Sequence, residues 1–573
     1  MTYLEFYLNL IKGVTLACAD EYKRGTLGAS LKAMRQAKRP AFVNELSHAG
    51  LLEERARELG SKPLLYFQGR SYSYAEMDAN ANRAANFLRG IGGAPGKTVA
   101  IVMKNSPRWL DVFFGAQKLG MCGVPINIQL RGEGLYYIFN HSEADFIAID
   151  HDLYPFYRAV EDKLEHPHRL IVNAAGAPAS LQPPAGAIAL EAAYAAGASA
   201  TRPQVAIDPE SNCLMLYTSG TTGRAKGVPT KFSKTQLKSM IVLARATLKP
   251  SDIYYTCLPL FHANALLLTV SMAMAGKAAV AMSEKFSASK FWDEVRETGT
   301  TVFNSIGAMI PILMKQPERP NDRENKVRYV MSAACPTAMW RPFEERFHTT
   351  IYEGYGAVDG GGFIVINFGA APPGSMGKPL FGKYRLVDDQ DRDVPARTPG
   401  ELIFWAGSQP GSAVEYHKDA AASEKKLRDG WLHTGDLVWK DEKGNLFFAG
   451  RKTEFMRRKG ENISAYDVEQ AILQHPDLVE CAVFAVPSEL AEDEVMAVVV
   501  PLPGKDPDPF AIAKFLEDKL ARFAIPRYWR MVSELPKTET QRVIKGPLEK
   551  QGVTADTIDT DSRLSAASAA KGQ

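Results

Sequence analysis

The stretch Tyr217–Val228 reads Y-T-S-G-T-T-G-R-A-K-G-V and decides how the whole chain is interpreted. The apolar run 213–216 precedes it and predicts a buried strand. Glycines let the backbone approach a bulky anion closely. Hydroxyl and amide groups, with the charge of Lys226, can then bind phosphate oxygens. The residue order differs from G-x-x-x-x-G-K-[ST], so we expect a phosphate loop of another kind. The alternative is a flexible turn between a strand and a helix, which twelve ordered positions of this composition disfavour.

Length and composition bound the class of protein. The chain has 573 residues, more than a single hydrophobic core supports, so we expect several domains. An apolar fraction of 46% and a charged fraction of 23% are typical of a soluble globular protein, and a net charge of +3 gives no argument for a nucleic-acid partner. The six cysteines form no C-x-x-C pair and the ten histidines no H-E-x-x-H motif. This pattern disfavours a disulfide framework or a zinc site and predicts a reducing, cytoplasmic environment.

The first segment, 1–62, is predicted to be a leader that contains an amphipathic helix. Apolar residues fall at helical spacing on one side of it: Leu4, Tyr7, Leu8, Ile11, Val14 and Cys18. A basic cluster follows: Lys23, Arg24, Lys32, Arg35, Lys38 and Arg39. We expect this helix to pack on the protein's own body. The alternative is peripheral contact with the inner face of a membrane.

Apolar runs alternate with helical patterns over most of the chain. Between residues 63 and 450 this alternation predicts layered parallel α/β subdomains, with a small β-barrel at Lys383–Trp405. A hinge is expected at Gly450–Thr453, followed by a small, mobile α+β C-terminal domain at 451–552. The polar, Ala/Ser-rich stretch 553–573 predicts a disordered tail.

The motif at 217–228 resembles the signature of the AMP-forming adenylating enzymes. Further segments follow in the order of that superfamily: P-L-F-H at Pro259–His262, S-A-A-C-P at Ser332–Pro336, Y-G-A-V-D at Tyr355–Asp359, W-L-H-T-G-D at Trp431–Asp436 and R-K-G-E-N-I-S at Arg458–Ser464. The resemblance covers nearly the whole chain. Within the superfamily the chain looks most like long-chain and fatty-acid-transport-protein-type acyl-CoA synthetases, with carnitine-CoA ligases second.

The resemblance implies an acyl-CoA synthetase that uses ATP, Mg²⁺ and coenzyme A. Its substrate would be a small carboxylic acid, expected to be a medium- or long-chain fatty acid, while steroid-like and aryl acids remain open. One alternative is a synthetase-fold protein that cannot adenylate and only binds or thioesterifies acyl-AMP. Another is a membrane-associated lipid-uptake protein. The sequence gives no oligomeric state.

The resemblance also assigns roles to individual residues. Lys226 and the loop residues would contact the phosphates: Thr218, Ser219, Gly220, Thr221, Thr222 and Gly223. Tyr355 and Gly356 would lie at the adenine, and Asp359 would hold Mg²⁺. His262 would border the acyl pocket, although a core histidine is the alternative reading.

Three further contacts are implied in the last third of the chain. Asp436 would accept hydrogen bonds from the ribose hydroxyls, because a carboxylate is an acceptor-only group, and Arg451 would be a second ribose or phosphate contact. Lys459 and Gly460 would face the pantetheine of CoA. Arg542 occupies the slot of the lysine that relatives use in adenylation. Its planar fork is bulkier than an ammonium, so we expect a slow first step, unless Lys545 reaches the site instead.

Overall fold

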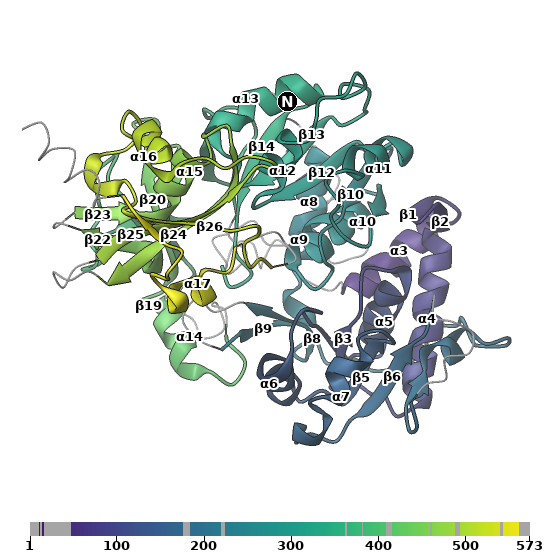
Figure 1. Ribbon diagram of the computed structural model, residues 1–573. Coiled ribbons are helices and arrows are strands. Elements are labelled where there is room, and N and C mark those ends of the chain that lie inside the picture. The colour runs from purple at the N-terminus through teal and green to yellow at the C-terminus, as the bar shows by residue number, and fades with distance from the viewer. Residues whose placement is uncertain are drawn as a thin grey trace, which may run out of the picture.

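The computed structural model describes residues 47–175, 184–218, 224–360, 364–380, 382–407, 415–458, 461–487, 493–538 and 543–560, together with residues 8, 11, 14 and 15. Two large sheets flanked by helices build the N-terminal part, and a small sheet builds the C-terminal part at the left of Figure 1. The expected α/β fold with a large N-terminal part and a small C-terminal part is confirmed.

A seven-stranded sheet carries the phosphate-loop motif. Its order is β7 (Ile188–Ala189), β6 (Arg169–Asn173), β5 (Phe146–Asp150), β3 (Thr98–Val102), β4 (Cys122–Pro125), β8 (Asn212–Thr218) and β9 (Lys226–Lys231). The strands pair in parallel except for β8 and β9, which pair antiparallel. The short apolar runs that predicted these strands are buried on both faces, as is usual in parallel sheets.

The second sheet joins a parallel half to an antiparallel half. Its parallel strands are β14 (Ile351–Tyr355), β13 (Tyr329–Ala333), β12 (Val302–Ile306), β10 (Ile253–Thr256), β11 (Ala279–Met282) and β1 (Pro63–Phe67), with β2 (Arg70–Ser73) at the edge. Its antiparallel strands are β15 (Val365–Asn367), β16 (Ser375–Pro379), β21 (Leu446–Arg451), β20 (Trp431–Lys440), β18 (Gly400–Trp405) and β17 (Tyr384–Val387), and β19 (Leu427–Arg428) pairs with β20. The small β-barrel expected at Lys383–Trp405 is instead a layer continuous with the sheet through β16, and no printed pairing of the described strands closes it.

Helices cover both sheets and seal one continuous hydrophobic core between them. Those of the N-terminal part are α3 (His48–Leu59), α4 (Tyr74–Gly90), α5 (Pro107–Lys118), α6 (Gly132–Ser142), α7 (Tyr154–Arg158), α8 (Leu237–Thr247), α9 (Ala263–Ala265), a π-helix (Leu266–Ser271), α10 (Met272–Ala275), α11 (Phe291–Glu297), α12 (Met309–Met314), α13 (Thr337–Phe347) and α14 (Ala420–Lys426). No helix in the described ranges is long and apolar enough to cross a bilayer.

The C-terminal part has its own core and two sheets. A hairpin of β22 (Phe455–Arg458) and β23 (Glu461–Ser464) precedes the sheet β24 (Leu478–Pro487), β25 (Asp493–Pro501), β26 (Tyr528–Met531) and β27 (Ile558–Asp559). Its helices are α15 (Ala465–Ile472), α16 (Pro509–Leu516) and α17 (Lys545–Gln551). The core cluster within 456–529 is built from this part alone.

Two expected boundaries are wrong. The leader was expected to reach residue 62, but Leu51 and Leu52 of α3 lie in the main core. The disordered tail was expected from 553, but β27 pairs with β26, and Asp559 holds Arg527 through two hydrogen bonds of 3.0 and 2.8 Å. In both places the stretch is mostly polar, so its composition did not indicate the few residues that tertiary contacts hold in the fold.

Candidate active site

The phosphate motif forms the closure of an antiparallel hairpin rather than a strand-to-helix turn. Thr218 ends β8 and pairs with Lys226, which begins β9. The Thr218 hydroxyl donates to the Lys226 carbonyl at 3.5 Å. Ser219, Gly220, Thr221, Thr222 and Gly223 lie outside the described residues. The hairpin therefore places Lys226 directly opposite the start of the loop, where an ammonium can reach an anion that the loop holds.

Two neighbouring strands carry the residues that are expected to bind the ribose. Asp436 in β20 lies opposite Arg451 in β21, and the Arg451 Nε is 3.5 Å from Oδ1 of Asp436. The Tyr355 hydroxyl, at the end of β14, donates to Oδ2 of Asp436 at 2.6 Å. Burial raises the pKa of Asp436, while Tyr355 and Arg451 act in the opposite direction. The structure thus brings together the three residues that the sequence assigned to the nucleoside.

The S-A-A-C-P segment at Ser332–Pro336, which by its resemblance to the family is expected on the adenine side, is held by a residue that the sequence did not point to. The carboxylate of Glu353 in β14 accepts hydrogen bonds from the amides of Ala334 and Cys335, the latter at 3.3 Å. Ala334 has a φ of +70°, an unusual conformation for a residue with a side chain, which these bonds help to maintain. Burial outweighs the two amides and raises the pKa of Glu353 to about 7.

Asp359 has two partners at the phosphate side. The Tyr416 hydroxyl donates to its Oδ2 at 2.5 Å, and the Lys426 Nζ lies 3.0 Å from the same oxygen. Burial alone would raise the pKa of Asp359, but the charge of Lys426 and the hydrogen bonds from Tyr416 and Lys426 hold it below its ordinary value. The carboxylate is therefore ionised and already paired with a cation.

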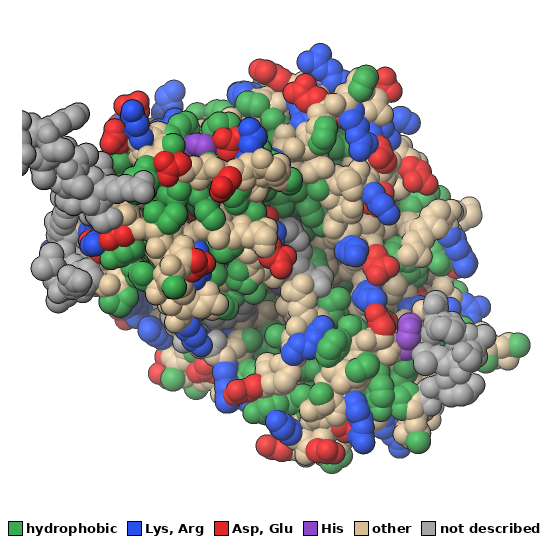
Figure 2. Space-filling model, in the orientation of Figure 1, with side chains coloured by type: hydrophobic (Ala, Val, Ile, Leu, Met, Phe, Trp, Pro, Cys, Tyr) green, Lys and Arg blue, Asp and Glu red, His purple; other side chains and the backbone are tan. Residues whose placement is uncertain are grey.

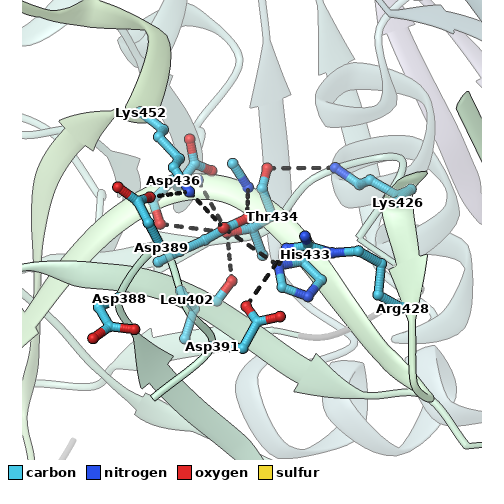
Figure 3. A network of polar contacts seen from close by, with 12 residues as sticks. Asp388, Asp389, Asp391, Leu402, Lys426, Arg428, His433, Thr434, Asp436 and Lys452 are labelled. Atoms are coloured by element: carbon cyan, nitrogen blue, oxygen red, sulfur yellow. Dashed lines mark hydrogen bonds and ion pairs between the residues drawn. The ribbon is translucent and has the colours of Figure 1, made fainter. Parts of the chain in front are cut away.

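A buried glutamate fixes the turn that carries Asp436. Glu401 in β18 accepts a hydrogen bond from the Gly435 amide at 3.1 Å, and lies 3.3 Å from Nδ1 of His433 and 3.4 Å from Nζ of Lys452. Figure 3 shows Lys452 on one side of this network and Lys426 on the other. Burial alone would raise the pKa of Glu401, but His433 and Lys452 lower it to about 2. Gly435 has a φ of +78°, which glycine adopts without strain.

His262 lies where the parallel strands of the second sheet end. It follows β10, whose neighbour β12 leads into Ile306 and Gly307. A buried Asn105, which follows β3 of the other sheet, donates to the Leu258 carbonyl at 2.9 Å and accepts from the Leu260 amide at 2.8 Å. These bonds clamp the P-L-F-H segment between the two sheets. Burial lowers the pKa of His262 to about 4, so its ring is neutral near pH 7.

The C-terminal residues assigned to the chemistry are only partly described. Lys459 and Gly460 connect Arg458 to Glu461 across the β22–β23 hairpin, and they lie outside the described residues, as does Arg542. Lys545 does not replace Arg542 in this structure, because its Nζ is 2.8 Å from Glu469 and 3.4 Å from Glu454. The hairpin lies at the outer left of Figure 1, far from β8.

The molecule is hollowed where the two parts meet, as Figure 2 shows. Among the contacts between the parts are two hydrogen bonds and the edge-on packing of the Phe448 and Tyr466 rings. The Lys315 ammonium donates to the Leu478 carbonyl, and the Ser464 hydroxyl donates to the Ala449 carbonyl at 2.6 Å. The β22–β23 hairpin, whose connection was expected to face CoA, lies away from β8 in this arrangement.

Comparison with known proteins identifies the class. Residues 52–410 match the model of the AMP-binding enzymes, and residues 467–542 match that of their C-terminal domain. The chain belongs to the AMP-binding enzyme family. It is an ATP-dependent, AMP-forming acid–CoA ligase, so the expected activity is confirmed at this level.

Curated relatives and solved structures share most of the chain. A crotonobetaine/carnitine–CoA ligase of Salmonella paratyphi A (strain ATCC 9150 / SARB42) is 29% identical over 87% of this chain and 98% of its own length. The crystal structure of the anthranilate CoA ligase AuaEII with anthranoyl-AMP has a TM-score of 0.78 at 24% identity, covering 88% of this chain and 97% of that one. The crystal structure of a benzoate CoA ligase from Burkholderia xenovorans LB400 has a TM-score of 0.76 at 23% identity, covering 88% of this chain and 100% of that one.

This class uses ATP, Mg²⁺ and coenzyme A, and the described residues fit ATP and Mg²⁺, whereas Lys459 and Gly460, which were expected to face coenzyme A, are not among them. Asp436, Arg451 and Tyr355 offer a diol site, and Lys226 offers a charge at the phosphates. No group of three or more metal-ligating side chains occurs among the described residues. Mg²⁺ is commonly held by one or two carboxylates together with substrate phosphates and water, so the ionised Asp359 suffices as its protein ligand. The ion would neutralise charge on the phosphates of ATP.

Proposed function

We propose that the chain activates a compact carboxylic acid that carries a second polar group near its carboxylate. The observation that carries this proposal is the imidazole of His262. Its Nε2 is buried and has no hydrogen-bond partner among the described residues. A buried polar atom without a partner costs about 1–3 kcal/mol, so a ligand that supplies the partner gains affinity at this position.

The surroundings of His262 support a polar rather than a purely apolar pocket wall. Asn264, two residues on, accepts a hydrogen bond from Nδ2 of Asn304 at 2.8 Å. The neutral imidazole can donate or accept one hydrogen bond at Nε2. A long alkyl chain offers no partner to this atom, whereas a hydroxyl, amine or carbonyl substituent does.

The names of the relatives support the compact size of the acid, although benzoate among them carries no second polar group. The acids that they state are crotonobetaine, carnitine, anthranilate, benzoate and o-succinylbenzoate, all of them compact. The medium- or long-chain fatty acid expected from the sequence is the second candidate. The observation that supports this candidate is that Gly307 and Ala308, which follow β12, are small and would leave space for a longer acyl chain.

The reaction follows from the residues at hand. In the first step the carboxylate of the acid attacks the α-phosphorus of ATP, the bond from that phosphorus to the bridging oxygen breaks, and pyrophosphate leaves. Lys226 stabilises charge on the phosphates while Asp436 holds the ribose. In the second step the thiolate of CoA attacks the acyl carbonyl and AMP leaves. Since the β22–β23 hairpin lies far from β8 in this arrangement, we infer that the C-terminal part rotates between the steps.

The proposal is tested with a matched pair of acids. We expect kcat/KM to be about tenfold higher for anthranilate than for benzoate, which lacks the amino group. About tenfold is the effect of one hydrogen bond to a buried partner. His262→Leu should remove this preference and leave the KM for ATP unchanged, while His262→Gln should retain part of it. A palmitate kcat/KM above that of every compact acid would support the fatty-acid candidate instead. Release of pyrophosphate in the presence of ATP and an acid would exclude the alternative that the protein cannot adenylate.

The N-terminal helix favours a second role, peripheral contact with a membrane. Leu8, Ile11 and Val14 are helical and 57%, 62% and 38% exposed, so the expected packing on the protein's own body is not seen at these positions. Exposed apolar residues on one side, followed by the basic cluster, suit an anionic lipid surface. Co-sedimentation of the intact and the 1–46-deleted chain with phosphatidylserine-containing vesicles tests this role. Equal binding of the two would contradict it.

A further inference from the structure

Two lysines that are distant in sequence flank one tyrosine at the phosphate side of the site. The Lys226 ammonium lies over the Tyr416 ring, 4.9 Å from its centroid. The Tyr416 hydroxyl and the Lys426 ammonium both contact Oδ2 of Asp359. Tyr416 is buried, and its neighbour His417 donates its backbone amide to the Gly227 carbonyl at 2.8 Å. The segment that carries Tyr416 is thus fixed against the phosphate hairpin.

Lys426 also reaches the ribose motif. Its Nζ donates to the carbonyl of Thr434 at 3.4 Å, as Figure 3 shows. Thr434 lies two residues before Asp436, and Asp359 lies four residues after Tyr355. The ammonium therefore lies between the two segments that hold the nucleoside. The phosphates of ATP must pass this point, because the ribose lies at Asp436 and the phosphate loop begins at Thr218.

An ammonium has three donors, and Lys426 has two hydrogen-bonding partners among the described residues. Its remaining donor is available to a further acceptor, and its charge is partly desolvated because the side chain is only 13% exposed. Lys425, the preceding residue of α14, is exposed. The alternative is that both adjacent lysines simply lie at the solvent-exposed end of a helix. This description fits Lys425 but not Lys426.

We propose that Lys426 is a phosphate-binding residue of the ATP site, which Asp359 and Tyr416 hold in position. Mg²⁺ held by Asp359 would weaken the pairing of this carboxylate with the Lys426 ammonium, since the two positive charges repel. The Lys426 ammonium would then be freer to bind a phosphate oxygen. The inference rests on the adenylating activity of the chain and not on the identity of its acid.

The first test is calorimetric binding of ATP and of adenosine, without acid and with Mg²⁺ present, to full-length variants. We expect Lys426→Met to weaken ATP by at least about tenfold, the value of a charged hydrogen bond, and to leave adenosine nearly unchanged. Lys425→Met should bind both ligands as the wild type does. Unchanged ATP affinity in Lys426→Met would overturn the proposal. An equal loss for ATP and adenosine would also overturn it, because it would show a merely structural role.

A second variant keeps the proposal falsifiable should Lys426→Met fold poorly. In EDTA, Asp359→Asn removes the carboxylate that competes for the Lys426 ammonium, so ATP should bind severalfold more tightly than to the wild type. Combining Asp359→Asn with Lys426→Met should abolish this gain. Absence of the gain in the single variant, or its persistence in the double variant, would contradict the proposal.

Discussion

The nucleotide side and the acyl side of the site differ in how their polar groups are satisfied. On the nucleotide side each carboxylate already has partners: Asp436 has Tyr355 and Arg451, and Asp359 has Tyr416 and Lys426. On the acyl side the Nε2 of His262 has no partner in the described part of the chain. Under the proposals above, ATP exchanges contacts that already exist, and this exchange is the same for every acid, whereas the acid supplies the partner that His262 lacks. We infer that specificity resides at His262 and general reactivity at the paired carboxylates.

The largest effect is expected from a substitution on the nucleotide side. Asp436→Ala removes a charged acceptor and leaves Tyr355 and Arg451 without it, so we expect a loss of about 1.5–3 kcal/mol, or about ten- to a hundredfold in kcat/KM for ATP. The loss should be equal for all acids. Glu442→Ala, which breaks an exposed pair with Arg397, is the control and should change little. An ATP dependence like that of the wild type in Asp436→Ala would contradict the ribose assignment.

Removing the phosphate-side charge should cost somewhat less. Lys226→Ala deletes an ammonium that begins β9 without disturbing the backbone pairing of the hairpin. We expect at least about a tenfold lower rate at subsaturating ATP, because one charged contact is lost. Thermal unfolding of the variant should match that of the wild type. A rate loss accompanied by a large drop in Tm would indicate a structural effect instead.

A smaller effect is expected at residue 542. Arg542→Lys restores the compact ammonium of the family pattern, so adenylation should become severalfold faster, while the thioester step stays unchanged. Pyrophosphate exchange and single-turnover thioester formation separate the two steps. If the wild type exchanges pyrophosphate as fast as the variant, the arginine is fully competent.

The last effect concerns stability and its dependence on pH rather than the reaction rate. Burial raises the pKa of Glu353 from 4.5 to about 7, so the folded protein keeps a proton that the unfolded chain releases. The stability that this proton confers is present below about pH 4.5 and is lost as the pH rises through about 7. Relative to Glu353→Gln, the wild type should lose about 2–3 kcal/mol between about pH 5 and about pH 8 in urea unfolding. A difference independent of pH would show that Glu353 is ionised throughout.

Sequence reasoning located the residues that lie in contiguous motifs. Tyr355, Asp436 and Arg451 meet as expected, because each belongs to a motif and the strands that carry them are neighbours or converge. It could not find Glu353, Asn105 or Tyr416, since a buried polar residue in a strand or loop has no periodic signal. Lys426 is adjacent to a second lysine in an exposed helix, so its pattern indicated solvent rather than a site.

The fold was predictable where pattern and pairing agree. The apolar run 213–216 lies in the buried strand β8, as predicted. The hairpin β8–β9 was missed because the loop composition fits a strand-to-helix turn as well as a hairpin closure. Strand β27 was missed because its two residues form a strand only by pairing with β26.

The central claim, that this site forms an acyl-adenylate from ATP, is tested most directly by the nucleotide product. Purified protein is incubated with ATP, Mg²⁺, CoA and a panel of compact and fatty acids, and the nucleotides are separated and quantified. The account predicts AMP and pyrophosphate in amounts equal to the acyl-CoA formed, with a compact polar acid giving the highest rate. Formation of ADP and phosphate with any of these acids would contradict it.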